Sequence, residues 1–216
     1  RSTLGSGLSA AAYACGAMAN SGTAGYIGGG SAASGNVGTV DKFAFPGDSR
    51  STLGTDLGTA RNRLAGMANS GTAGYFGGGY SPNTATVDKY AFSDDSRSTL
   101  STGLSSARSS LAGMANSGTA GYFCGGWTGS NVSTVDKFAF PGDGRSTLGT
   151  GLSYDANGPA GMANSGVAGY VGGGDDGGNV NTVNKFAFSD DSRSSLSPGL
   201  STTPYTAAAF ANCEAL

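Results

Sequence analysis

The stretch GMANSGTAGY at residues 66–75 recurs unchanged at 113–122, and with one change each at 17–26 and 161–170. A second phrase, RSTL, begins at residues 1, 50, 97 and 145 and returns as RSSL at 193. Registered on this phrase, the chain divides into similar units. The units are residues 1–49, 50–96, 97–144, 145–192 and a partial unit, 193–216. Repeats of this length indicate a solenoid, a propeller or an array.

Each unit predicts four short strands. In the second unit they are STLG at 51–54, LAGMAN at 64–69, TAGYFGGG at 72–79 and TVDKYAF at 86–92. The last alternates with the two-residue period of a half-buried strand, and glycine interrupts every window long enough for a helix. Four strands in about 48 residues are typical of one propeller blade. The sequence therefore predicts an all-β chain with no α-helix.

Turn signals separate these strands. NSG suits a three-residue hairpin loop with glycine in the left-handed conformation. PGD or SDD suits a turn before the outermost strand. The small residues of AGMAN suit the innermost strand, where blades crowd together. We expect four complete four-stranded blades within residues 13–54, 62–101, 110–149 and 158–197, with two partial blades at the ends. Tyrosines between neighbouring blades should be buried, namely Tyr26, Tyr75, Tyr122 and Tyr170.

The order GYFGGG, TVDKYAF, STL and GLSSAR (103–108) resembles the kelch repeat over nearly the whole chain. The resemblance implies a kelch-like β-propeller, forming one domain or a segment of a larger propeller. No tryptophan follows the KFAF strand, and leucines stand near that place. The amino-acid sequence of the repeat is also similar to kelch-like repeats of bacteriophage tail and appendage proteins, particularly from phages of cyanobacteria. Some kelch-like propellers are copper oxidases whose metal sites use histidine, and this chain has none.

The near-invariant phrases indicate scaffold, because identical turns recur wherever identical blades recur. Two regions differ between units: the loop after the glycines and the segment after GL. In a blade of alternating strands both emerge on one face. That face is either a recognition surface or a set of unconstrained exposed loops. Tight turns on the opposite face need Gly and Asn, which explains part of the contrast.

Candidate ligand-binding residues follow from this variable face. Trp127 is the only tryptophan and could stack on a sugar ring, and Tyr80 holds the matching position one unit earlier. Both could instead cap the core of their own blade. Asp175 and Asp176 could offer carboxylates to Ca²⁺ but lack the spacing of a known loop, which favours a solvated turn. The remaining candidates on this face are Tyr154, Arg61 and Arg108.

Composition limits the function classes. A net charge of −2 with 12 Lys and Arg argues against nucleic acid as a partner. No apolar run reaches the ~20 residues of a membrane-spanning helix. Without histidine, a Ser-His-Asp or Cys-His arrangement cannot be built, and we expect neither catalytic residues, nor a metal site, nor a cofactor. Low charge with abundant Gly, Ser, Thr and Ala is typical of extracellular or virion-surface proteins. Asn131 begins a formal N-glycosylation sequon, NVS, which matters only in a secreted eukaryotic protein.

Two functions fit these observations. The first is a module that binds glycan or protein through the variable face, as an adhesin, lectin or phage receptor-binding part. The second is a structural module of a fibre, matrix or virion appendage that packs against copies of itself or other parts of a longer chain. Residues 207–212 should form an inner strand of an incomplete blade. Its missing strands would come from further residues of a longer propeller, which we favour, or from another chain. Cys15 and Cys213 should then not be bonded. Lys42, Lys89, Lys137 and Lys185 should point outward and serve solubility.

Overall fold

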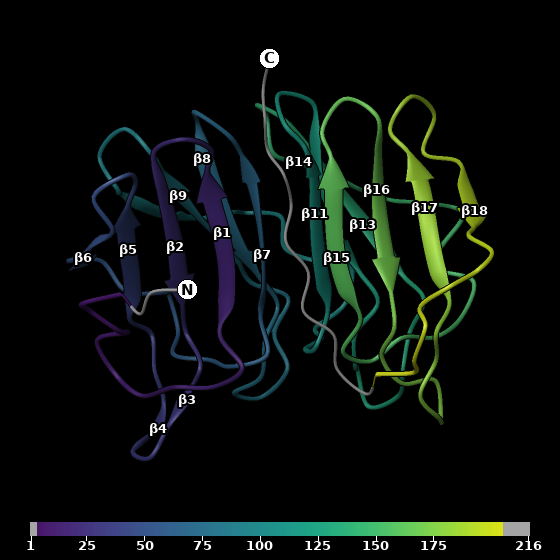
Figure 1. Ribbon diagram of the computed structural model, residues 1–216, viewed down its shortest axis with the longest axis horizontal. Coiled ribbons are helices and arrows are strands. Elements are labelled where there is room, and N and C mark those ends of the chain that lie inside the picture. The colour runs from purple at the N-terminus through teal and green to yellow at the C-terminus, as the bar shows by residue number, and fades with distance from the viewer. Residues whose placement is uncertain (1–3, 205–216) are drawn as a thin grey trace.

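The computed structural model describes residues 4–204, and these residues form an all-β structure with no helix (Figure 1). Four four-stranded antiparallel sheets follow one another along the chain, and we call them blades 1 to 4. Blade 1 contains β1 (Gly16–Asn20), β2 (Ala24–Gly28), β5 (Val40–Ala44) and β6 (Ser49–Thr52). Blade 2 contains β7 (Ala65–Asn69), β8 (Ala73–Gly77), β9 (Val87–Ala91) and β10 (Arg97–Thr99). Blade 3 contains β11 (Ala112–Asn116), β12 (Ala120–Cys124), β13 (Val135–Ala139) and β14 (Gly144–Thr147). Blade 4 contains β15 (Ala160–Asn164), β16 (Ala168–Gly172), β17 (Val183–Ala187) and β18 (Arg193–Ser195). The predicted strands and the absence of helix are confirmed for the described residues.

The first strand of each blade contacts the first strand of the next, in the order β1, β7, β11 and β15. This arrangement, with the other strands fanning outward, is that of neighbouring blades in a propeller (Figure 1). A small extra hairpin of β3 (Ser31–Ala32) and β4 (Gly35–Asn36) extends the loop after β2. The prediction that AGMAN supplies the innermost strand is confirmed.

The tight turns between strands contain residues that adopt the left-handed backbone conformation. Between β7 and β8, Gly71 has φ +79°, in the left-handed region that favours glycine, and Thr72 donates a backbone hydrogen bond to Asn69. The turn before each outermost strand ends on a left-handed aspartate, in place of glycine. The four residues are Asp48, Asp95, Asp143 and Asp191, with φ between +51° and +58°. Aspartate tolerates this conformation better than most residues do, because its short side chain bonds locally.

The core lies between blades, because each blade packs its face against the next. Gly77 ends β8 and faces the ring of Phe123 in blade 3, so that a Cβ at Gly77 would overlap this ring. At the next interface Cys124 replaces this glycine, and Val171 replaces the phenylalanine opposite it. Cys124 is fully buried, and burial raises the pKa of its thiol to about 12. A larger residue on one side is matched by a smaller one on the other, which keeps the interior close-packed.

Polar contacts between blades repeat in the same way. Tyr75 stacks on Phe140 of the next blade with ring centroids 5.3 Å apart, and its hydroxyl donates to Asp143 Oδ1 at 2.7 Å. Lys89 Nζ donates to Asp143 Oδ2 at 2.6 Å and lies over the Tyr75 ring. Equivalent contacts join blades 1 and 2 and blades 3 and 4. They involve Tyr26, Lys42, Phe92 and Asp95, and Tyr122, Lys137, Phe188 and Asp191.

This arrangement confirms one expectation and corrects another. Tyr26, Tyr75 and Tyr122 are each buried between blades, as predicted. The prediction was wrong for Tyr170, which is only half-buried because no later blade among residues 4–204 packs against it. The recurring lysines were expected to point outward for solubility, but Lys42 and Lys89 are ion-paired to the following blade, as is Lys137. In each case a tyrosine of the same blade orients the lysine. The lysine ammonium lies over the tyrosine ring, and the ammonium and the tyrosine hydroxyl donate to the same aspartate.

Hydrogen bonds also define two opposite ends of the blades. The turn after β7 bonds the turn after β9, through Phe92 N and Thr72 O at 3.0 Å. At the other end, the loop after β8 bonds the segment leading into the next blade, through Gly79 N and Arg108 O at 2.9 Å. The variable loops therefore lie on one face and the uniform turns on the other, as the sequence predicts.

The outermost strands alternate in length from one blade to the next. β6 and β14, which follow PGD, contain four residues, whereas β10 and β18, which follow SDD, contain three. The expected strand at 207–212 and the expected absence of a Cys15–Cys213 bond fall partly or wholly outside the described residues. Within the described residues no helix could span a membrane.

Candidate functional site

The variable face is built from matched pairs of segments, one pair in each blade. The residue after each glycine pair forms a bridge with the segment that enters the same blade. These bridges are Tyr13–Ser31, Asn62–Tyr80, Ser109–Trp127 and Asn157–Asp175. Backbone pairing therefore places Tyr80 and Trp127 at equivalent positions on neighbouring blades.

Asparagine side chains join these positions from blade to blade. Asn36 Nδ2 donates to the Tyr80 carbonyl at 3.0 Å, and Asn83 Nδ2 donates to the Trp127 carbonyl at 2.9 Å. Asn131 Nδ2 likewise donates to the Asp175 carbonyl at 2.9 Å. Each such bond fixes the backbone under the candidate side chain, so the aromatic rings stand on ordered loops.

Tyr80 and Trp127 are exposed, with 48% and 38% of their surface accessible. The Arg63 guanidinium lies over the Tyr80 ring, 5.9 Å from its centroid, which is a cation–π contact. Tyr13, at 69% exposure, stands on the same face in blade 1. Sequence reasoning missed Tyr13 and Arg63, although both lie in the segment after GL that differs between units.

The acidic end of this face lies in blade 4. Asp176 is exposed and Asp175 half-buried, and Asp176 N donates to the Gly178 carbonyl within a tight turn. No group of three or more carboxylate, thiol or imidazole side chains suited to a metal ion occurs in residues 4–204. The sequence brings only two adjacent carboxylates here, as in a solvated turn.

Tyr154 is half-buried and serves mainly as a packing residue. Its hydroxyl donates to the Gly173 carbonyl at 2.9 Å, and its ring packs against the core between blades 3 and 4. Burial, together with the nearby Asp176 carboxylate, raises its pKa to about 12. Tyr154 therefore holds the glycine pair that precedes Asp175.

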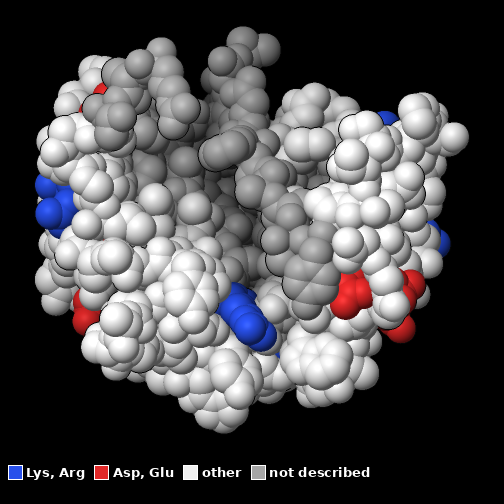
Figure 2. Space-filling model, turned by 60° about the horizontal axis from the view of Figure 1, so that its bottom comes forward, with Lys and Arg blue, Asp and Glu red and all other residues white. Residues whose placement is uncertain are grey.

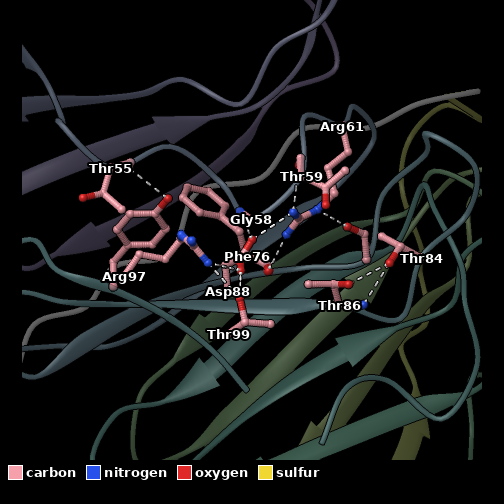
Figure 3. A network of polar contacts seen from close by, with 12 residues as sticks. Thr55, Gly58, Thr59, Arg61, Phe76, Thr84, Thr86, Asp88, Arg97 and Thr99 are labelled. Atoms are coloured by element: carbon pink, nitrogen blue, oxygen red, sulfur yellow. Dashed lines mark hydrogen bonds and ion pairs between the residues drawn. The ribbon is translucent and has the colours of Figure 1, made fainter. Parts of the chain in front are cut away.

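Arg61 and Arg108 lie elsewhere than the sequence led us to expect, because both are fully buried. Arg61 Nη1 is 2.9 Å from Asp88 Oδ2, and its Nε and Nη2 donate to the carbonyls of Gly78 and Phe76 (Figure 3). Arg108 pairs in the same way with Asp136. The guanidinium groups point into the blades and not toward the surface, so they brace the loops beneath the variable face.

The buried carboxylates are strongly held. Burial alone would raise the pKa of Asp88, but hydrogen bonds from Thr99 and Gly58 and the Arg61 guanidinium lower it below its ordinary value. Arg97 adds a second ion pair from the outermost strand at 3.3 Å (Figure 3). The same causes lower the pKa of Asp136. These carboxylates remain ionised at neutral pH and tie the inner loop to the outer strand in blades 2 and 3.

A cavity of about 170 Å³ opens beside these loops in blade 2, lined by Thr59, Arg61, Ser81, Pro82, Asn83 and Thr84. Asn83 also holds the Trp127 carbonyl, so the cavity and the exposed indole share a loop. Seen from the variable face, the molecule is mostly uncharged, with isolated basic and acidic groups (Figure 2). The face therefore offers aromatic and neutral polar groups.

Comparison with solved structures places this architecture. The structure of YjhT matches with a TM-score of 0.73 over 89% of this chain and 67% of that chain, at 16% sequence identity. The fold is propeller-like. No family model matches the chain, and no curated protein matches it either. At this identity the similarity to YjhT describes the fold alone.

Proposed function

We propose that this chain is a kelch-like β-propeller module without catalytic activity that recognises a glycan or a protein through its variable face. The observation that carries the proposal is the placement of Tyr80 and Trp127. Both are large, exposed and held at equivalent positions on neighbouring blades, whereas scaffold aromatics between the blades, such as Tyr75 and Phe123, are buried. Aromatic rings with an apolar face and a polar edge suit sugar rings and protein surfaces alike.

Two further features support recognition. The Asn36 and Asn83 bonds order the backbone before a ligand arrives, which lowers the entropy lost on binding. Tyr13 and Arg63 extend the row of candidate contacts, and Asp175 and Asp176 supply acceptors at its far end. A low charge fits a neutral glycan or a polar protein surface on an extracellular or virion-surface partner. The kelch-like phage appendage proteins that the repeat resembles fit the same setting.

A glycan array and a panel of cell-surface proteins would test the proposal. The double variant Tyr80→Ala with Trp127→Ala should abolish any binding found for the wild-type chain. Its melting temperature should barely change, because both rings are well exposed. Val167→Thr is the matched control: Val167 is 55% exposed and lies in the β15–β16 turn at the opposite end.

Two outcomes contradict the proposal. One is a loss of stability of about 3–5 kcal/mol in the double variant, the range of a truncated buried aromatic, which would assign both rings to the core. The other is retained binding with both rings removed. A second function, a structural module that packs against copies of itself, is favoured by Met162 of blade 4, which is 43% exposed, whereas the equivalent Met67 of blade 2 is 3% exposed.

A further inference from the structure

Every interface between blades uses one set of groups from the earlier blade and another from the later blade. Between blades 2 and 3, Met67 lies against Gly121, where a Cβ would overlap its sulfur. Tyr75 and Lys89 of blade 2 both donate to Asp143 of blade 3. The earlier blade thus supplies a methionine, a tyrosine and a lysine. The later blade supplies a glycine, a phenylalanine and a left-handed aspartate.

Blade 4 keeps the complete set of the earlier blade, which we call the donor edge: Met162, Tyr170 and Lys185. Met162 is 43% exposed, whereas the equivalent Met67 is 3% exposed. No residue between 4 and 204 accepts a hydrogen bond from the Tyr170 hydroxyl or the Lys185 ammonium. The donor edge is therefore built but not covered by the described part of the chain.

Blade 1 keeps the complementary set, which we call the acceptor edge: Gly25, Phe45 and Asp48. Phe45 is 43% exposed, whereas the equivalent Phe140 is 8% exposed. Asp48 has φ +51°, like its counterparts in the other blades, and its carboxylate receives no side-chain donor from residues 4–204. One chain thus carries both halves of an interface that it makes three times internally.

One residue of blade 1 departs from the pattern. Ala17 stands where blades 2 to 4 have glycine, at Gly66, Gly113 and Gly161. A Cβ on Gly66 would overlap the carbonyl oxygen of Ala17 in the preceding blade. The methyl group of Ala17 would therefore press on the Gly161 carbonyl if blade 1 followed blade 4 with the internal geometry. This contact weakens the pairing of the two edges at the inner strand. It leaves the contacts of Tyr170 and Lys185 with Phe45 and Asp48 in place.

We propose that the donor edge of one copy binds the acceptor edge of a second copy, head to tail. Tyr170 and Lys185 of one molecule donate to Asp48 of the next, Tyr170 stacks on Phe45, and Met162 covers Gly25. The positive ammonium and the negative carboxylate are complementary; Asp48 is exposed and Lys185 is half-buried. Because the interface is heterologous, repeated association gives a ring or an open filament.

Sedimentation velocity and light scattering on the whole chain across a concentration series test the proposal. The wild-type chain should associate reversibly. Asp48→Asn, which keeps the left-handed turn, and the double variant Tyr170→Phe with Lys185→Ala should each weaken association by about tenfold or more. Asp94→Asn is the control, because Asp94 is an exposed aspartate of the equivalent turn in blade 2 whose carboxylate bonds only within that turn, to Ser96. Ala17→Gly should tighten association roughly tenfold.

Mixing identifies the geometry. The Asp48→Asn chain retains its donor edge, and the Tyr170→Phe, Lys185→Ala chain retains its acceptor edge. Together they should form dimers that neither forms alone, and these should not grow further. Monomers at every concentration, or association unaffected by both edge variants, would overturn the proposal. Circular dichroism of each variant separates a lost contact from a lost fold, and none of these readouts involves the ligand.

Discussion

Arg61 Nη1 lies 2.9 Å from Asp88 Oδ2, and neither side chain is accessible to solvent. Removing the arginine alone should leave a buried carboxylate with only Arg97, Thr99 and Gly58 to hold it. We expect Arg61→Ala to lower the free energy of unfolding by about 3 kcal/mol, at the lower end of the range for a broken buried pair. Urea denaturation followed by circular dichroism measures this change. A loss below about 1 kcal/mol would mean that Arg61 contributes little.

Blade 4 provides the matched control for that experiment. Ala156 and Asn184 stand at the positions of Arg61 and Asp88, so blade 4 lacks both charges. Asn184 instead accepts from Ser153 N at 2.7 Å and donates to Ser195. The double variant Arg61→Ala with Asp88→Asn should therefore recover at least about 1 kcal/mol of the single-variant loss. Additive losses in the double-mutant cycle would contradict this coupling.

The buried carboxylates also set the acid limit of stability. The pKa values of Asp88, Asp136 and Asp41 are lowered in the folded chain from an ordinary value of 3.8. Their stabilisation is fully present above that value and is lost as pH falls through the lower folded pKa. We expect the melting temperature to fall steeply below about pH 4, with protons taken up on unfolding. A chain with Arg61→Ala, Asp88→Asn, Arg108→Ala and Asp136→Asn should show a shallower fall between pH 4 and 2, and an unchanged slope would contradict the assignment.

The matched residue sizes at the interface between blades 3 and 4 can be introduced at the interface between blades 2 and 3. Gly77→Cys alone should be strongly destabilising, by about 3 kcal/mol, because its side chain meets the Phe123 ring. Adding Phe123→Val reproduces the Cys124–Val171 pair and should restore part of that loss. Thermal unfolding of the single and double variants measures the coupling. The idea fails if the double variant is no more stable than Gly77→Cys.

The inner strands offer a test with an internal control. Asn69 Oδ1 accepts from Gly118 N of the next blade at 2.7 Å. Asn164 occupies the same position in blade 4 but is exposed, and its side-chain oxygen accepts from no donor among residues 4–204. Asn69→Ala should destabilise the chain by about 1 kcal/mol, whereas Asn164→Ala should change little. Equal effects of the two substitutions would remove the interblade bond as an explanation.

Much of the fold follows from local rules in the sequence. The Gly71 turn, the strand period of residues 86–92 and the repeat length together predict four-stranded blades. The loop positions of Tyr80 and Trp127 could be predicted too, because strand alternation fixes which loops share a face.

What sequence reasoning missed depends on contacts between distant units. Arg61 and Lys89 look like exposed charges in their own segments, and only the packed blades show their partners, 27 and 54 residues away. Tyr13 was missed because nothing in its neighbouring sequence distinguishes an exposed aromatic from a core one. A single sequence specifies local conformation more directly than it specifies which charges will meet.

The one-way chemistry of the blade interface bears on how such a protein can change length. Every junction joins the tyrosine and lysine of one unit to the aspartate of the next, so most units are interchangeable at their boundaries. Unequal recombination between the near-identical coding segments would add or delete a whole unit while leaving each new junction chemically matched. The Cys124–Val171 pair is the exception, because its two members belong to different units and a deletion between them would separate them. Length variants should therefore differ by whole units, and those that keep blades 3 and 4 together should be the more stable.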